Sequence, residues 1–166
     1  MTPNDVFAVL EAQFGSNGVS GVSQSGLDLF ALVEPEALVA VCTFLRDDPR
    51  LGFDFLNNVS GVDFLEPEAK KAAKAGFEPH LEVVYHLSSF AHPGRRFALK
   101  VMLPRWKDDV PGNLPEVPTV SGVWPAADWH EREVYDLVGV RFVGHPDPRR
   151  ILLAADWVGH PLRKDY

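Results

Sequence analysis

The sequence contains a single cysteine, Cys42, among 166 residues. One thiol excludes a framework of disulfides. It also excludes an iron–sulfur cluster held only by cysteines of this chain, because such clusters use about four thiolates. Cys42 lies in an apolar helical pattern, which predicts a small buried core residue.

Long hydrophobic runs are also lacking. No apolar run approaches the roughly 20 residues that a helix needs to span a bilayer. The opening segment, MTPNDVFAVLEAQFG, has neither the basic start nor the apolar centre of a signal peptide. We therefore expect a cytoplasmic protein that does not insert into a membrane and that reaches one only through partners.

Several sequence motifs for nucleotide binding and for catalysis are absent. The sequence has no Gly-x-Gly-x-x-Gly, no phosphate loop and no Gly-x-Ser-x-Gly, so binding of NADH, flavin or nucleotide by those routes has no support. The net charge of −7 argues against non-specific binding of nucleic acid.

Hydrophobic periodicity predicts two helices and five strands in the first part of the chain. The helices are expected over residues 4–14, with Asn4 as the cap, and from Pro35 to about residue 47. The expected strands span residues 19–23, 27–33, 53–65, 80–90 and 96–103. A tight turn is expected at Ser25-Gly26, a bulge or bend at Asn57-Asn58, and an exposed excursion with a helical turn over residues 66–76.

The strands do not alternate regularly with helices, so a parallel doubly wound sheet does not follow. The order predicts an α+β fold: a two-layer domain with a mixed, mostly antiparallel sheet, followed by a short helix and an extended C-terminal tail. We expect residues 1–103 to form the α+β core domain and 104–124 a proline-rich linker over the surface. Residues 125–166 are expected to form the short helix and the tail.

The short helix begins near Asp128, which has capping-box spacing to Glu131. Val134 and Val138 belong to its apolar stripe, and Gly139 supplies a stop. Beyond Gly139, prolines hold the chain extended, yet the segment is too apolar for a free tail. Such a tail gains most by lying across another surface.

The charge of the chain is uneven. Residues 139–166 carry a balance of +2, and the rest of the chain carries −9. Either this basic tail meets an acidic docking surface on another molecule, or the difference is ordinary scatter.

The last quarter of the chain carries a resemblance to a known family. Its residues read Glu131-Arg132-Glu133, Tyr135-Asp136, Gly144-His145-Pro146-Asp147 and Arg149-Arg150-Ile151-Leu152, then Asp156-Trp157 and Gly159 to Tyr166. This pattern resembles the C subunit, or 30-kDa subunit, of NADH:quinone oxidoreductase, which is respiratory complex I. Two departures from the family pattern fall in the tail: Pro148 stands where leucine is usual, and Ala154-Ala155 where proline and an acid commonly occur.

The resemblance implies a structural subunit of the hydrophilic arm of a proton-translocating enzyme that transfers electrons from NADH to quinone. It implies a peripheral position on the cytoplasmic side of the cell membrane, in contact chiefly with subunits D and B. NADH, FMN, iron–sulfur clusters and quinone would belong to partner subunits, and this chain would have no catalytic, cofactor or metal residue. The expected partner-binding residues are Glu131, Arg132, Glu133, Tyr135, Asp136, His145, Asp147, Arg149, Arg150, Trp157, His160, Arg163 and Lys164.

Three alternatives remain open. The same subunit type occurs in related membrane-bound hydrogenase complexes. A stand-alone metal-dependent hydrolase could use His130 and Glu133, which share a helix face at i, i+3, together with His145. A plain protein-binding module outside respiration is the third. The repeated Gly-His-Pro at Gly144 and Gly159 is better explained by a local backbone fold in which each imidazole bonds a carbonyl or carboxylate.

Overall fold

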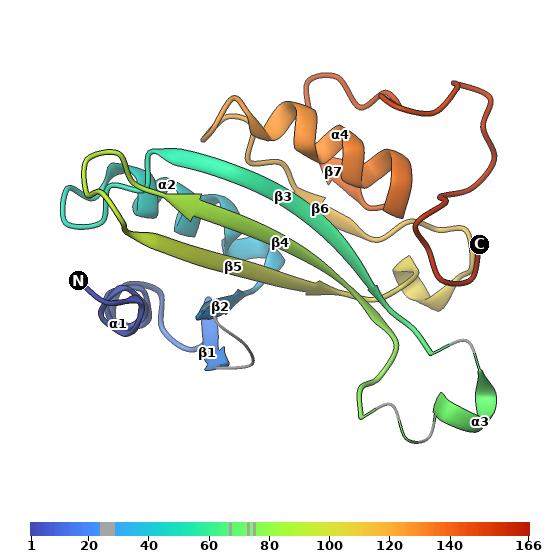
Figure 1. Cartoon of the computed structure of the whole chain (residues 1–166), viewed down its shortest axis with the longest axis horizontal. Helices are drawn as coiled ribbons and strands as arrows, with labels where there is room; N and C mark the ends of the chain where they lie inside the picture. The colour runs from blue at the N-terminus through green and yellow to red at the C-terminus, as the bar shows by residue number, and fades with distance from the viewer. Residues whose placement is uncertain (24–28, 67, 73, 75) are drawn as a thin grey trace.

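The computed structural model describes residues 1–23, 29–66, 68–72, 74 and 76–166 (Figure 1). The turn expected at Ser25-Gly26 lies outside these residues. The longer helices are α1 (Pro3–Phe14), α2 (Leu38–Asp47) and α4 (Ala127–Val138). A helical turn, α3 (Ala69–Ala72), lies in the expected excursion, and two short 3-10 helices are η1 (Pro35–Ala37) and η2 (Lys107–Asp109).

The main sheet has five strands in the order β1-β2-β5-β4-β3. The strands are β1 (Val19–Ser23), β2 (Phe30–Val33), β3 (Phe55–Phe64), β4 (His80–Ser88) and β5 (Arg96–Leu103). Only the β2–β5 pair is parallel among the described strands of this sheet, so the prediction of a mixed, mostly antiparallel sheet is confirmed. The register of β3 against β4 shifts between Leu56 and Asn58, where the sequence predicts a bulge.

The N-cap of helix α1 lies two residues before the predicted cap, Asn4. Thr2 is the N-cap, and Asn4 lies within the first turn. The side chain of Thr2 accepts from Asp5 N, while Asp5 Oδ2 accepts from Thr2 N at 2.6 Å. This capping box satisfies two free amides, one more than Asn4 alone could satisfy, so the helix starts there.

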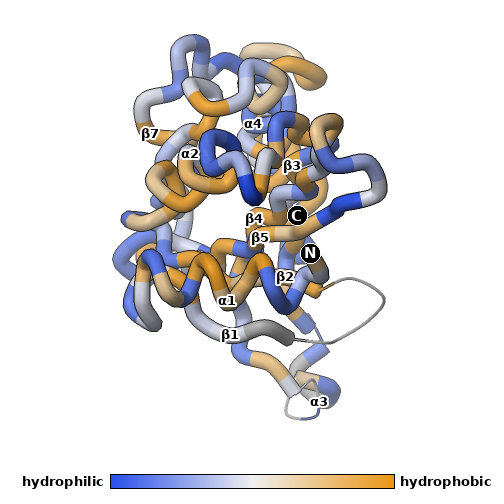
Figure 2. The backbone as a smooth tube through the Cα atoms, turned by 90° about the vertical axis from the view of Figure 1, so that its left-hand side faces the viewer, coloured by the Kyte–Doolittle hydropathy of each residue, from blue (hydrophilic) through white to orange (hydrophobic). Residues whose placement is uncertain are grey.

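The core lies on the face of β4 that carries Leu81, Val83, Tyr85 and Leu87, all at most 1% exposed. Helices α2 and α4 contribute to the same hydrophobic cluster, and Figure 1 shows α2 behind the long strands and α4 beyond β3. In Figure 2 the hydrophobic segments of α1, α2 and the central strands gather in the middle, and α3 stands apart below.

The expectation of a surface linker is wrong for the second half of residues 104–124. Strand β6 (Glu116–Pro118) lies there, and Val117, Val120 and Trp124 are buried in the core cluster. The prolines of this segment do not prevent β6 from pairing with another strand, because the neighbouring carbonyls and amides make the hydrogen bonds. Arg141 N donates to Pro115 O at 2.9 Å, and β6 thereby pairs in parallel with β7 (Arg141–Val143).

Within the described part of the chain, no helix combines the length and the apolar character needed to cross a membrane.

Helix α4 can approach β3 closely because residue 61 is glycine. A Cβ built on Gly61 would lie 2.9 Å from Val134 Cγ1 and 3.0 Å from Val138 Cγ2. We expect Gly61→Ala to lower the free energy of unfolding by about 1–3 kcal/mol, because the extra methyl group pushes α4 off the sheet. Urea unfolding measures this loss. Gly122→Ala is the matched control, since nothing lies within 4 Å of its Cβ position. An equal loss of unfolding free energy in both variants would contradict the close packing of α4 on β3.

Candidate partner-binding site on helix α4 and the C-terminal tail

Helix α4 carries two buried carboxylates, Glu131 and Asp136, each with no exposed surface. The predicted capping box at Asp128 is wrong: the N-cap is Ala126 and makes no side-chain bond. Glu131 instead turns inward to the loop that follows β6. It accepts hydrogen bonds from the Thr119 hydroxyl and, at 2.8 Å, from Val120 N.

Asp136 holds the beginning of the tail. Its Oδ2 accepts three consecutive backbone amides, from Ile151, Leu152 and Leu153, at 3.1, 2.8 and 2.9 Å. Its Oδ1 lies 2.7 Å from Arg150 Nη1. Burial opposes ionisation of Asp136, but these hydrogen bonds outweigh it and lower the pKa of the carboxyl. The tail therefore folds around an ionised carboxylate of its own chain.

Arg150 extends this contact along the tail. Its Nη2 donates to Trp157 O and Gly159 O, each at 3.0 Å, and its Nη1 also donates to Asp136 O. One guanidinium thus ties two separate tail segments to α4, because its fork of donors reaches several acceptors at once.

The two Gly-His-Pro repeats place their imidazoles on α4, which confirms the prediction of a local backbone fold. His145 Nε2 lies 3.0 Å from Asp128 O, and His160 Nδ1 lies 3.0 Å from Asp136 O. Gly144 and Gly159, which precede them, both have left-handed backbone angles, with φ of 82° and 85°. Burial lowers the pKa of His160.

Arg163 fastens the end of the tail. Its Nε donates to Val138 O at 2.8 Å, and its Nη2 donates to Gly139 O at 3.2 Å. These are free carbonyls at the end of α4, where a cation is favourable. The guanidinium also lies 3.8 Å from the ring centroid of Trp106.

The tail then returns to β3 and β5. Lys164 N donates to Asp63 Oδ2 at 2.9 Å, and Arg105 pairs with both Asp63 and Asp165. Figure 1 shows this path: the tail arches around the far side of α4 and descends beside the end of β3.

The expected site residues therefore divide into three groups. Glu131, Asp136, His145, Arg150, His160 and Arg163 make contacts within the chain, and so does Arg132, whose Nε donates to Arg149 O at 3.1 Å. Glu133, Arg149, Trp157 and Lys164 are exposed. Tyr135 and Asp147 are half-buried.

The partner-binding residues predicted from the sequence do not include four apolar residues that the tail exposes. They are Leu152, Val158, Leu162 and Tyr166. Their apolar character beyond Gly139 was a usable signal, but sequence alone does not tell which apolar side chains of an extended segment point outward.

The residues of the alternative metal site do not assemble. Among the described residues no group of three or more His, Cys, Asp and Glu side chains could hold a metal ion. Glu133 is exposed, whereas the side chain of His145 is 2% exposed and points to Asp128 and Glu131. The geometry therefore offers no ligand set for the hydrolase.

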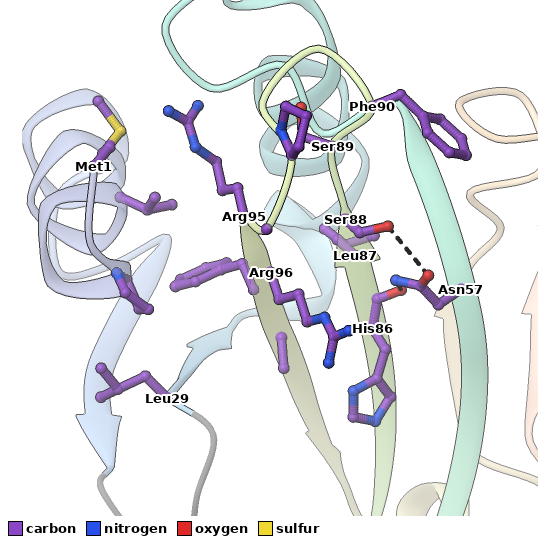
Figure 3. Close-up of a pocket in the computed structure, with 16 residues that line it drawn as sticks. Met1, Leu29, Asn57, His86, Leu87, Ser88, Ser89, Phe90, Arg95 and Arg96 are labelled. Carbon is purple, nitrogen blue, oxygen red and sulfur yellow. Dashed lines mark hydrogen bonds between the residues drawn. The ribbon is translucent and has the colours of Figure 1, made fainter.

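The described part of the chain has hollows on its surface, including one beside α4 and one beside the start of α1. One of about 520 Å³ lies between α4 and β7, and its lining includes Glu131, Tyr135 and His145. The other, of about 730 Å³, lies between the start of α1 and the ends of β4 and β5 (Figure 3). Its lining includes His86 and Arg96 but none of the expected site residues.

Comparisons with known proteins identify a matching family and several similar proteins. The family described as "Respiratory-chain NADH dehydrogenase, 30 Kd subunit" matches residues 31–166. The C subunit of NADH-quinone oxidoreductase from Roseiflexus sp. (strain RS-1) is 46% identical over 149 residues, which cover 90% of this chain and 75% of that protein. The C subunit from Coxiella burnetii (strain RSA 493 / Nine Mile phase I) is 39% identical over 169 positions, covering 89% of this chain and 69% of that protein.

A solved structure of the trypsin-resistant fragment (1-134) of Nqo5 is similar in fold. It superposes with a TM-score of 0.57 at 28% sequence identity, covering 86% of this chain and 98% of the fragment. The predicted α+β class is thereby confirmed.

Loss of the Asp136 charge should release the tail. We expect Asp136→Asn to lower the free energy of unfolding by about 3 kcal/mol, because it leaves Arg150 without its buried partner. Hydrogen exchange at the amides of residues 151–153 should speed up with it. Asp156→Asn, an exposed change in the same tail, is the control and should leave exchange unaltered. Slow exchange at residues 151–153 in Asp136→Asn would contradict this role.

The contribution of Glu131 to the stability of the protein should fall as the pH rises from about 4.5 to 7. Burial raises the pKa of this carboxyl from 4.5 to about 7, and its bonds to Thr119 and Val120 offset only part of that rise. In this window the folded state binds a proton that the unfolded state has lost, so stability decreases by up to about 1.4 kcal/mol per pH unit.

Glu131→Gln isolates this effect. His160 acts in the opposite direction near pH 6.5, because its lowered pKa favours the folded state as the pH rises. The difference between the original protein and Glu131→Gln cancels that contribution. Urea unfolding at pH 5 and pH 8 should show that difference change by about 2–3 kcal/mol, and a difference independent of pH would show that Glu131 titrates normally.

Proposed function

Because the chain belongs to the family of the 30-kDa subunit of respiratory-chain NADH dehydrogenase, we propose that it braces the quinone-reducing part of its complex and carries no redox centre. Membership makes the chain a component of NADH-quinone oxidoreductase, a multi-subunit enzyme. A brace acts through geometry: it holds neighbouring subunits at the separation and orientation that electron transfer to quinone needs.

The observation that carries this proposal is the construction of the tail. Asp136 and Arg163 fix it to the body of the chain, while Trp157 and Val158 remain exposed. A segment that is held rigid and still presents large apolar side chains is suited to contact another protein. We propose subunits D and B as the neighbours, on the cytoplasmic side of the membrane.

The absence of a redox centre has chemical support in the sequence. Cys42 is the single cysteine and is fully buried in the core, so the chain cannot supply the thiolates of an iron–sulfur cluster alone. We propose that NADH, FMN, iron–sulfur clusters and quinone are bound by partner subunits.

The alternatives have less support. The relatives described above are named as subunits of NADH-quinone oxidoreductase, which favours an NADH-linked complex over a hydrogenase. The metal-dependent hydrolase lacks an assembled ligand set among the described residues.

Co-purification tests the brace. The chain is co-expressed with subunits D and B of the same organism, and recovery on a tag carried by this chain is compared between variants. We expect the unmodified chain to retain both subunits. Arg163→Gln should reduce recovery severalfold, because it frees the end of the tail from α4 and Trp106. Arg96→Gln, an exposed change on β5, should have no effect.

Failure of the unmodified chain to retain either subunit would contradict the proposed function. Stoichiometric flavin or iron in the chain purified alone, detected by its visible absorption, would contradict the absence of a redox centre.

A further inference from the structure

We propose that the outer surface of the tail docks into an uncharged apolar groove of a neighbouring subunit, so that the contact depends on hydrocarbon burial and not on ion pairs. This inference rests on the proposed function and specifies the chemistry of the partner surface. The partner surface proposed here is apolar, whereas the net charge of the tail suggests an acidic one.

The tail exposes a set of large apolar side chains. Val158 is 86% exposed, Tyr166 64%, Leu152 63%, Leu162 59% and Trp157 44%. Single exposed apolar residues are common on protein surfaces, but several in one short segment indicate an interaction site.

Contacts within the chain close the segment that carries four of these side chains into a loop. A Cβ built on Gly159 would lie 2.8 Å from the Tyr166 ring, so the ring packs on the backbone next to Val158. Leu162 N donates to Leu137 O at 2.9 Å, which holds the middle of the loop against the end of α4. Residues 157–166 therefore form a closed loop, called here the apolar loop.

The positive charge of the tail is largely used within the chain. Arg150 pairs with Asp136, Arg149 pairs with Asp147, and Arg163 is buried against backbone carbonyls and Trp106. Among the described residues from 156 onward, Asp156 and Lys164 are the exposed charged side chains that form no ion pair, one of each sign. A surface with so little net charge is complementary to an uncharged partner.

The apolar loop is also ordered before it meets a partner. Arg150 donates to Trp157 O and Gly159 O, and the Arg163 side chain donates to Val138 O, so docking does not require the loop to fold. A preformed loop that exposes Trp157 and Val158 fits a groove better than a flat surface, because buried anchors dominate protein–protein affinity.

Affinity measurements on the co-expressed subunits test this inference. The full-length chain carrying Val158→Ser together with Leu162→Ser is compared with the unmodified chain and with Lys164→Gln. Each is titrated onto subunits D and B at about 0.05 M and about 0.5 M NaCl, where charge attractions are screened to different extents. Circular dichroism and hydrogen exchange at residues 151–153 establish that each variant is folded with its tail attached.

We expect the double serine variant to lose at least about tenfold in affinity, because two buried aliphatic side chains are lost. Lys164→Gln and the higher salt should each change affinity by less than about threefold. Unchanged affinity of the double variant, or a loss of about tenfold on raising the salt, would overturn the apolar docking while the proposed function stands. Absence of any association by the unmodified chain would overturn both.

Discussion

The structure of the second half of the chain depends on one buried carboxylate. Asp136 lies on α4 with no exposed surface, and it organises a segment that has no regular secondary structure after β7. A charge in such a place is stable only if it is fully hydrogen-bonded. Three amides of the tail and the guanidinium of Arg150 meet that requirement. Because these donors are sequential, satisfying the charge and folding the tail are the same event.

The same principle governs the other polar groups near α4. Arg163 caps the carbonyls at the end of α4. Glu131 holds the loop after β6 to the first half of α4. Polar groups thus face inward and join segments, whereas several apolar side chains of the tail face outward. This is the reverse of the usual distribution in a globular domain. Such a distribution suits a chain that is a component of a multi-subunit complex.

Much of the fold could be predicted from the sequence, because it depends on local periodicity. The alternation of Leu81, Val83 and Tyr85 identifies the buried face of β4, and the Asn57-Asn58 pair identifies the bulge in β3. The role of residues 115–124 could not be predicted, because proline-rich composition suggests a loop and the pairing of β6 with β7 joins segments distant in sequence. The resemblance to the 30-kDa subunit likewise singled out Asp136 and Arg150, but it did not predict the contact between them. Both the contact of the tail with subunits D and B and the residues that make it stay predictions.

The bond between Lys164 N and Asp63 joins residues 101 positions apart. During translation the amino-terminal part of a chain folds first. The strands and α4 of this chain therefore emerge from the ribosome well before the amides and arginines that complete them. Until residues 150–163 emerge, Asp136 and the carbonyls at the end of α4 lack their partners. A chain cut before residue 150 would keep the buried apolar cluster but leave the Asp136 carboxylate and these carbonyls without their donors, so the apolar core and its polar fastenings form at different times.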